Sequence, residues 1–229
     1  MRERLMPIAG TVDDTERSYI PALGKRWLLP LYDPFLWLLG ADKAKQSLIE
    51  QAEIKPGFRV LDIGCGTGSM AIVVKRTHPQ AEVVGIDPDP SALSVCRRKA
   101  NRAGLPIEFD RGFADHMSYA DASFDRVFSS FMFHHLDPDE KTATLGEIRR
   151  VLKPGGSLHL LDFVREHSVH SGTKEHGQLI HRRGPVAERI ESRMTSLMND
   201  AGFVDATELK RAKNFFGPIA YYRANSPAA

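Results

Sequence analysis

Short apolar runs that end in an acidic or polar residue alternate with longer amphipathic stretches along most of this chain. The pattern predicts strands at 58–63 and 81–86 and near residues 107, 124 and 157, with helices at 68–77 and 90–103. Continuous apolar runs are typical of strands that are buried on both faces. Strands that alternate with helices indicate a parallel sheet covered by helices on both faces.

The segment after Asp162 follows a different pattern. It predicts a loop and a helix that reaches about residue 200, followed by two closing strands at 204–209 and 215–223. No internal repeat or low-complexity tract interrupts the chain. We therefore expect a single sheet that is completed by its last two strands.

The N-terminal part is less regular than the rest. Residues 1–26 read as an arm, and Asp33-Pro34 predicts the start of an apolar helix. The breaker Lys55-Pro56-Gly57 separates this part from the first strand. We predict an N-terminal arm and helical cap over residues 1–53 and a ligand-binding α/β domain over residues 54–229.

The first strand runs into a turn with glycine at alternate positions, Gly64, Gly66 and Gly68, directly after Asp62 and Ile63. Glycine permits a tight turn and lets the backbone approach a bound molecule closely. The dinucleotide-binding fingerprint needs its last glycine one position later, where this chain has serine. The pattern therefore favours a nucleoside ligand other than a dinucleotide.

The second apolar run ends in Asp87, nineteen residues after Gly68. A carboxylate accepts two hydrogen bonds at once, and the cis-hydroxyls of a ribose offer two donors in matching geometry. Asp89 and Pro90 follow as the predicted N-cap and first residue of a helix. Asp87 is therefore the predicted ribose-binding residue.

Together with the blocks Phe113-Ala114-Asp115, 123–130 and 145–156, these residues resemble the class I S-adenosylmethionine-dependent methyltransferases. The resemblance extends from about Ile54 to the C-terminus and is strongest to the small-molecule branch that includes the ubiquinone and menaquinone methyltransferases, particularly in 124–136. It implies a Rossmann-like α/β fold with a seven-stranded, mostly parallel sheet and helices on both faces. The ligand crevice is expected at the carboxyl ends of the strands.

The same resemblance implies S-adenosyl-L-methionine as cofactor and S-adenosyl-L-homocysteine as product. The glycine turn is expected at the methionine end, Asp87 at the ribose, residues 113–115 at the adenine and Ser130 near the methionyl group. The expected cofactor-binding set is Asp62, Gly64, Gly66, Thr67, Gly68, Asp87, Pro88, Phe113, Ala114, Asp115 and Ser130.

Methyl transfer from a sulfonium needs the nucleophile, methyl carbon and sulfur in line, so alignment and exclusion of water matter more than a universal catalytic residue. An oxygen or nitrogen nucleophile can also need a base, and histidine exchanges protons near neutral pH. His134 and His135, after the fourth strand, are the candidates. The alternatives are that this pair begins the next helix with local hydrogen bonds, or that it positions the substrate. At most one of the two is expected to face the substrate, unless the chain turns between them.

A group of histidines, His167, His170, His176 and His181, lies in the polar segment 164–185. Their spacing matches no regular metal-ligand pattern, and no cysteine accompanies them. We expect no metal site and interpret the segment as a solvated loop over the active site.

The charge balance argues against nucleic acid as a partner. The 229 residues carry 31 basic and 29 acidic side chains, a net charge of +2, so the chain has no strong positive field. The segment after the fourth strand reads Ser129-Ser130-Phe131-Met132 and lacks the Asn/Asp-Pro-Pro-aromatic motif of base-amino methyltransferases. A nucleic-acid methyltransferase is therefore the weaker alternative.

The two cysteines and the N-terminal sequence favour a cytoplasmic protein. Cys65 and Cys96 lie in different predicted elements and form no metal-spaced pair, which fits a reducing compartment. No signal-peptide pattern is seen at the start, and the apolar stretch 27–39 is shorter than the ~20 residues of a spanning helix. This stretch fits an apolar lid over a small aromatic or prenylated substrate, peripheral contact with a membrane surface, or core packing.

The sequence predicts an enzyme that transfers a methyl group to oxygen, nitrogen or carbon of a small organic molecule. One alternative is a relative of the same fold that binds the cofactor without methyl transfer, such as a cyclase or a decarboxylase-like enzyme. Another is a ligand-sensing protein. The acceptor atom and the oligomeric state do not follow from the sequence.

Overall fold

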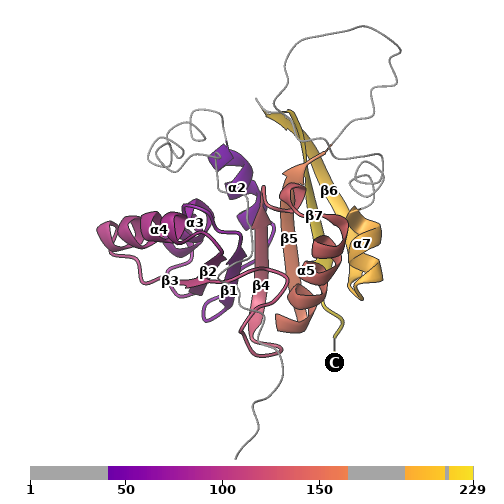
Figure 1. Cartoon of the computed structure of the whole chain (residues 1–229), viewed down its shortest axis with the longest axis horizontal. Helices are drawn as coiled ribbons and strands as arrows, with labels where there is room; N and C mark the ends of the chain where they lie inside the picture. Colours follow the sequence, from indigo (N-terminus) through magenta and orange to yellow (C-terminus); the bar gives the residue numbers. More distant parts are fainter. Residues whose placement is uncertain (1–40, 165–193, 215–216, 229) are drawn as a thin grey trace, which may run out of the picture.

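Seven strands form a single sheet in the order β3-β2-β1-β4-β5-β7-β6 (Figure 1). The structure, a computed structural model, describes residues 41–164, 194–214 and 217–228. The first five strands of this order are parallel to one another, and β7 runs antiparallel to both β5 and β6. The predicted seven-stranded, mostly parallel sheet is confirmed.

The elements follow the predicted order. The strands are β1 (Arg59–Ile63), β2 (Glu82–Asp87), β3 (Glu108–Arg111), β4 (Phe124–Ser130), β5 (Leu152–Phe163), β6 (Val204–Asn214) and β7 (Gly217–Asn225). The helices are α2 (Ala41–Glu50), α3 (Ser69–Thr77), α4 (Pro90–Arg102), the 3-10 helix η2 (Phe133–His135), α5 (Pro138–Val151) and α7 (Met194–Asp200).

Two strands are longer than the sequence pattern predicts. β5 begins already at Leu152, which pairs with Phe124 before an irregularity shifts the register. β6 continues through Asn214. Its polar residues lie at the edge of the sheet, where the strand pairs with β7 on one side only. Polar edge residues weaken the apolar signal by which a strand is recognised.

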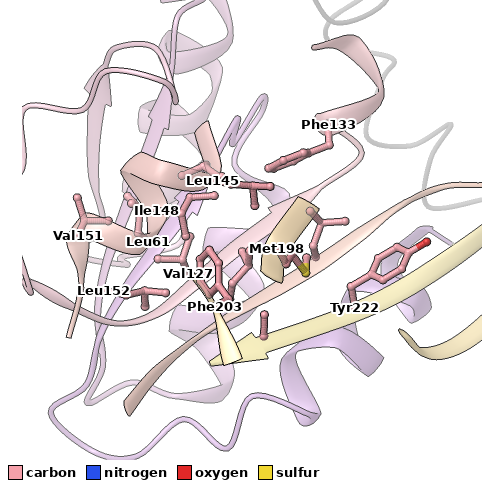
Figure 2. Packing of buried hydrophobic residues seen from close by; sticks show 14 of the residues in the cluster. Leu61, Val127, Phe133, Leu145, Ile148, Val151, Leu152, Met198, Phe203 and Tyr222 are labelled. Atoms are coloured by element: carbon pink, nitrogen blue, oxygen red, sulfur yellow. The ribbon is translucent and has the colours of Figure 1, made fainter. Parts of the chain in front are cut away.

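Side chains alternate between two cores, one on each face of the sheet. Leu61 of β1 belongs to the core under α5 and α7, and its neighbour Val60 belongs to the core under α2, α3 and α4. Figure 2 shows the first core, in which the labelled side chains include Leu61, Val127, Phe133, Leu145, Ile148, Val151, Leu152, Met198, Phe203 and Tyr222. Helices therefore cover both faces, as expected for a parallel sheet.

Helix ends are fixed by local caps. The Asp89 carboxylate accepts from Ser91 N–H at 2.8 Å and Pro90 opens α4, which confirms the predicted cap. Asp137 and Glu140 form a capping box at the start of α5.

The sheet reverses its strand order between β1 and β4. From β1 the chain proceeds outward through β2 to β3, and β4 then lies on the other side of β1. In open α/β sheets, ligands bind outside the carboxyl ends of the strands at such a switch point. The candidate residues after β1, β2 and β4 therefore lie at the edge where the fold provides a crevice.

α2 is the described part of the predicted N-terminal cap. Its residues Ala44, Leu48 and Ile49 are buried in the second core. Residues 1–40, with the predicted arm, apolar helix and membrane-contacting segment, lie outside the described residues, and the domain boundary at 53/54 stays a prediction. No helix among the described residues is long and apolar enough to cross a membrane.

Candidate active site

The glycine turn joins β1 to α3 and is tied to β2. The Cys65 N–H donates to the carbonyl of Ile86 at 3.1 Å, and the Gly66 N–H donates to Asp87 Oδ2 at 2.8 Å. From α4, Lys99 Nζ donates to the Thr67 carbonyl at 2.9 Å. Two neighbouring elements therefore hold the backbone of the turn in place.

The glycines at 64 and 66 are required for different reasons. Both have positive φ, 62° and 54°, a region that favours glycine. A Cβ at Gly64 would overlap the side chain of Met132, so the space beside Gly64 is already occupied by that side chain. A Cβ at Gly66 would meet nothing within 4 Å. Gly66 is therefore the position of the turn where backbone lies open to a ligand.

Asp87 lies at the end of β2 and is mostly buried. Its Oδ2 accepts from Gly66 N–H, and its Oδ1 accepts from Asp89 N–H at 2.9 Å. Burial raises the pKa of Asp87 above its ordinary value, and the two backbone donors oppose this shift. Each carboxylate oxygen has a second lone pair, so Asp87 can still accept from a ligand diol.

Asp62 is buried beneath the turn. Its Oδ2 accepts from Ala71 N–H at 3.2 Å, whereas its buried Oδ1 has no hydrogen-bond partner among the described residues. Burial raises the pKa of Asp62 to about 7, although the positive charge of Lys45 acts in the opposite direction. A buried oxygen without a partner is costly, which marks this position for a further donor.

Residues 113–115 form a tight loop after β3. Phe113 and His116 form an isolated bridge, and the loop is joined to β2 by Gly112 N–H, which donates to the Asp87 carbonyl at 3.3 Å. Phe113, Ala114 and Asp115 are all half-buried. Pro88 is also half-buried, and its carbonyl lies 3.4 Å from Arg111 Nε.

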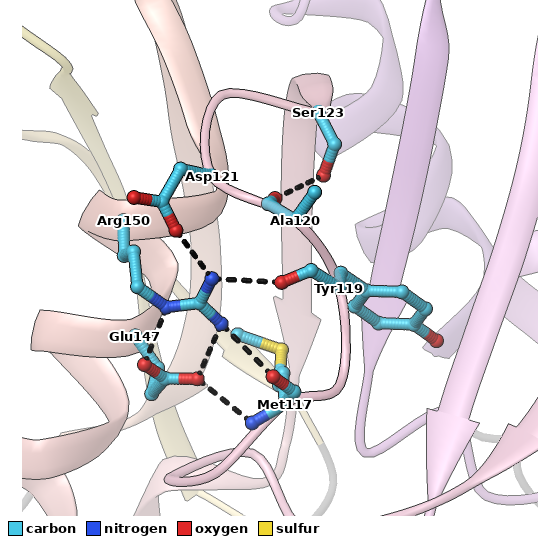
Figure 3. A network of polar contacts seen from close by, with 7 residues as sticks. All are labelled: Met117, Tyr119, Ala120, Asp121, Ser123, Glu147 and Arg150. Atoms are coloured by element: carbon cyan, nitrogen blue, oxygen red, sulfur yellow. Dashed lines mark hydrogen bonds and ion pairs between the residues drawn. The ribbon is translucent and has the colours of Figure 1, made fainter.

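The chain that follows this loop is bound to α5 by a polar network (Figure 3). Arg150 donates to the carbonyls of Met117 and Tyr119 at 2.9 and 2.7 Å and to Asp121 Oδ1 at 2.7 Å. Glu147 pairs with Arg150 and also accepts from Met117 N–H at 2.7 Å. These bonds lower the pKa of Glu147. The network fixes the loop that leaves the candidate adenine site.

His134 is held by Asp162 at the end of β5. His134 Nδ1 lies 2.7 Å from Asp162 Oδ1, and the His134 backbone N–H donates to Asp162 Oδ2 at 2.9 Å. A carboxylate can only accept, so the contact favours a proton on Nδ1 and leaves Nε2 as an acceptor. The pair joins the carboxyl ends of two adjacent strands.

Aromatic rings surround this histidine. The ring centroids of His134 and His135 are 3.9 Å apart, and Phe163 packs edge-on against His134 at 5.1 Å. Phe131 packs against Phe163 at 5.0 Å and has a φ of 56°, an unfavourable region for a side chain of this size. Such strain is retained where the surroundings enforce it, often at functional sites.

One expectation about the histidine pair needs correction. The pair lies in a short helix after β4, the 3-10 helix η2, and α5 begins only at Pro138 behind its own Asp137 cap. The side-chain bond of His134, however, is not local, because its partner Asp162 is 28 residues away. The 3-10 turn allows the two rings to lie side by side, which successive residues in a strand cannot do.

Of the predicted site residues, Asp62 and Asp87 lie at the ends of the adjacent strands β1 and β2, and the charge of Asp87 contributes to the raised pKa of Asp62. Ser130 lies at the end of β4, opposite Leu161 of β5, and Asp115 follows β3. These residues lie at the same edge of the sheet because β3 and β4 are parallel strands whose carboxyl ends face the same way.

Two residues of the site were not expected from the sequence. Asp162 ends an apolar strand in the same way as Asp62 and Asp87, so the signal was available. Lys45 had no such signal, since lysines in amphipathic helices are usually exposed.

Metal-binding clusters of three or more ligands are absent from the described part of the chain. The histidine-rich segment 164–185 lies almost entirely outside it, with only Val164 described.

Comparison with known proteins identifies related sequences. Residues 60–156 match the profile of a methyltransferase domain family, and residues 114–215 match that of the N-terminal domain of anamorsin. The second match does not include the glycine turn or Asp87. Two demethylmenaquinone methyltransferases are similar: that of Thermus thermophilus is 40% identical over 139 residues, and that of Deinococcus radiodurans 41% over 126 residues.

These alignments cover 59% and 55% of this chain, and 62% and 52% of the respective relatives. The chain thus matches less than two thirds of the length of either relative. A solved structure of a SAM-dependent methyltransferase from Aquifex aeolicus superposes with a TM-score of 0.64 at 20% identity, covering 88% of this chain and 98% of that one. At this identity the likeness concerns the fold.

The matched segment contains β1 to β4, the glycine turn, Asp87 and the histidine pair, and the sheet order is the one seen in the related fold. Residues 60–156 are therefore similar to a methyltransferase domain, and the sheet has the fold of a SAM-dependent methyltransferase.

Proposed function

We propose that this chain transfers a methyl group from S-adenosylmethionine to an oxygen, nitrogen or carbon atom of a small organic molecule. The observation that carries the proposal is the pairing of Gly66 with Asp87. An open stretch of backbone lies beside a carboxylate at the ends of two adjacent strands, within the segment that matches the methyltransferase family.

The residues at this edge fit the cofactor. Asp87 has lone pairs left for a ribose diol, and residues 113–115 form a fixed loop next to it for the adenine. The unpartnered Oδ1 of Asp62 suits a cationic donor at the methionine end. Ser130 is proposed beside the methionyl group from its place at the end of β4.

The chemistry divides between the cofactor and the protein. When bound, S-adenosylmethionine supplies an electrophilic methyl group on a sulfonium sulfur. The backbone turn and the strand ends align the reactants and exclude water from the crevice. His134 removes a proton from an acceptor hydroxyl or amine through Nε2, and Asp162 orients the ring and stabilises its charged form.

The acceptor is proposed to be a flat ring or to be attached to one. The similar enzymes of Thermus thermophilus and Deinococcus radiodurans are both named for demethylmenaquinone, a quinone and therefore a ring compound. Around His134, the half-exposed rings of Phe131 and Phe163 offer the stacking surface that such a substrate needs. An acceptor without a ring remains the alternative outcome of the test.

The experiment is methyl transfer from S-adenosylmethionine carrying a radiolabelled methyl group. Purified protein is incubated with prenylated naphthohydroquinones, simple phenols, amines and a small-molecule extract, and labelled product and S-adenosylhomocysteine are measured. A labelled methyl group on a ring hydroxyl or on a ring carbon of the acceptor supports the proposal. Cofactor binding without transfer to any acceptor would favour a cyclase-like or sensing protein, and no binding of either cofactor form would overturn the proposal.

A further inference from the structure

Three basic side chains from adjacent strands lie on the face of the sheet that α2 covers. They are Arg126 of β4, His159 of β5 and Arg223 of β7, and His159 stands directly opposite Arg223 in the antiparallel register. Arg126 is tied to the end of α2, since its Nε donates to the Ala52 carbonyl at 2.6 Å. This basic cluster lies toward the amino ends of β4 and β5, whereas the candidate active site lies at their carboxyl ends.

Two side chains of the basic cluster lack a hydrogen-bond partner for a buried nitrogen. His159 is 1% exposed; its Nε2 lies 2.9 Å from Ser157 Oγ, but its Nδ1 has no partner among the described residues. Arg223 is half-buried, and its buried Nε has no acceptor within residues 41–164, 194–214 and 217–228. Buried polar atoms are nearly always paired, because their desolvation is costly otherwise. The two opposite residues therefore both retain an unused nitrogen.

The charges of the basic cluster repel one another. Burial lowers the pKa of His159 to about 3, and the positive charges of Arg126 and Arg223 act in the same direction. Burial also lowers the pKa of Arg126, and the charge of Arg223 adds to that effect. Like charges in a partly buried site are unfavourable unless an opposite charge lies between them.

The two acids that act on the basic cluster do not balance it. Asp125 and Glu53 both act on Arg126. The Asp125 carboxylate already accepts from Lys153 Nζ at 2.8 Å, and Glu53 is exposed to solvent. The charges that act on His159 are both positive. The basic cluster therefore carries an excess of positive charge.

We propose that Arg126 and Arg223 bind a phosphoryl group, as free phosphate or as the phosphate of a small metabolite, in front of His159. Both arginines are half-buried, so part of each side chain reaches solvent, where an anion can dock. The planar fork of a guanidinium group matches two oxygens of a phosphate. A dianion suits this place better than a monoanion, because it neutralises two arginines at once.

This site is separate from the proposed methyl-transfer site. S-adenosylmethionine carries no phosphoryl group, and the basic cluster lies on the opposite side of the sheet edge that carries Asp87. The two sites therefore take different ligands. The inference stands or falls without the proposed function.

The test measures the thermal midpoint Tm of the full chain with inorganic phosphate, glycerol 3-phosphate or acetate at about 20 mM. The buffer contains no other oxyanion, and sodium chloride keeps the ionic strength constant. Each series is run with and without S-adenosylhomocysteine, so a failure of cofactor binding leaves the result readable. The variants are Arg223→Gln and Arg223→Lys, and the matched control is Arg98→Gln, which removes an exposed arginine of α4.

Phosphate should raise the Tm of wild type by about 4 °C or more, the shift expected for a dissociation constant of about 1 mM. Acetate should raise it by less than about 1 °C. The shift should be lost in Arg223→Gln, partly kept in Arg223→Lys and fully kept in Arg98→Gln. In buffer without phosphate, Arg223→Gln should melt no lower than wild type, because it removes a charge that repels its neighbours.

His159 provides a second measurement. A dianion in front of the ring favours its charged form, so sulfate, whose own charge is constant above pH 3, should raise the pKa of His159 in an NMR titration. An unchanged pKa would overturn the place assigned to His159.

Equal shifts with phosphate and acetate would overturn the inference, and so would a phosphate shift that survives in Arg223→Gln. If that variant does not fold, Arg223→Lys and the wild-type comparison of phosphate with acetate decide. A shift with inorganic phosphate alone assigns the site to the free ion, whereas a shift with glycerol 3-phosphate as well assigns it to a phosphorylated metabolite.

Discussion

His134 Nδ1 lies 2.7 Å from Asp162 Oδ1, and the same carboxylate accepts from the His134 backbone N–H at 2.9 Å. The side chain and the backbone of one residue are thus fixed by a single group on the neighbouring strand. This two-point contact orients the imidazole before any substrate arrives, which is what a positioned general base requires.

Replacing His134 by alanine is expected to lower turnover by ~10²-fold, because the acceptor proton loses its base. Asp162→Asn should lower turnover by about tenfold or more, since an amide can no longer fix the imidazole tautomer. Initial rates measured with saturating cofactor test both changes.

Cofactor affinity separates this role from a structural one. S-adenosylhomocysteine should bind the His134 and Asp162 variants as it binds wild type. His78→Asn, at the opposite end of α3, is the control histidine. A similar small loss of turnover for His134→Ala and His78→Asn would count against His134 as the base.

Asp87→Ala is expected to weaken cofactor binding by about 1 to 3 kcal/mol, because hydrogen bonds between a carboxylate and the ribose hydroxyls are lost. Calorimetric titration with S-adenosylhomocysteine measures the change. Asp205→Asn, an exposed carboxylate on β6, is the control and should leave the affinity unchanged. Unchanged affinity in the Asp87 variant would refute its assignment to the ribose.

Gly66→Ala should lower the free energy of unfolding by about 1 to 2 kcal/mol, the cost of a positive φ for alanine, and should also abolish cofactor binding. Gly104→Ala is the matched control, since Gly104 has a φ of 64° with open space around it and lies beyond the far end of α4. It should lose stability without losing affinity. Gly64→Ala should be the least stable of the three, because its methyl group overlaps Met132. Urea denaturation and calorimetry separate the two effects.

His159 makes folding sensitive to acid. Burial lowers its pKa to about 3 from an ordinary value of 6.5, so between these values the unfolded chain binds a proton that the folded chain does not. Stability due to this residue is complete above pH 6.5 and declines as pH falls toward 3, by at most about 1.4 kcal/mol per pH unit. His159→Phe should show a shallower decline in urea denaturation between pH 6.5 and 4 than wild type.

Asp62 has the opposite effect on the pH dependence of stability. Its pKa is raised to about 7 from 3.8, so between these values the folded chain holds a proton that the unfolded chain has released. Its contribution to stability therefore falls as pH rises from about 4 to 7. Relative to wild type, Asp62→Asn should gain stability as pH rises through this window. A gain that does not change with pH would contradict the buried, proton-holding state of Asp62.

Much of the edge that carries the site could be predicted because its signals are local. Alternate glycines, an acid at the end of an apolar run and an Asp-Pro helix start each depend on a few consecutive residues, as at Gly64, Asp87 and Asp89. The pairing of His134 with Asp162 depends on the register of β4 against β5, which a single sequence does not encode locally. Lys45 is the hardest case, since its burial depends on how α2 packs against the start of α3.

The hydrogen bonds of Arg150 affect the entropy cost of binding the cofactor. Its guanidinium already joins the carbonyls of Met117 and Tyr119 to α5 in the free protein. Fixing these residues during binding would otherwise reduce affinity, by roughly 1 to 2 kcal/mol of backbone entropy for each residue ordered. This entropy is already lost when the protein folds. Binding of the adenine should therefore order few further residues, and the cofactor should associate with the protein as with a rigid surface.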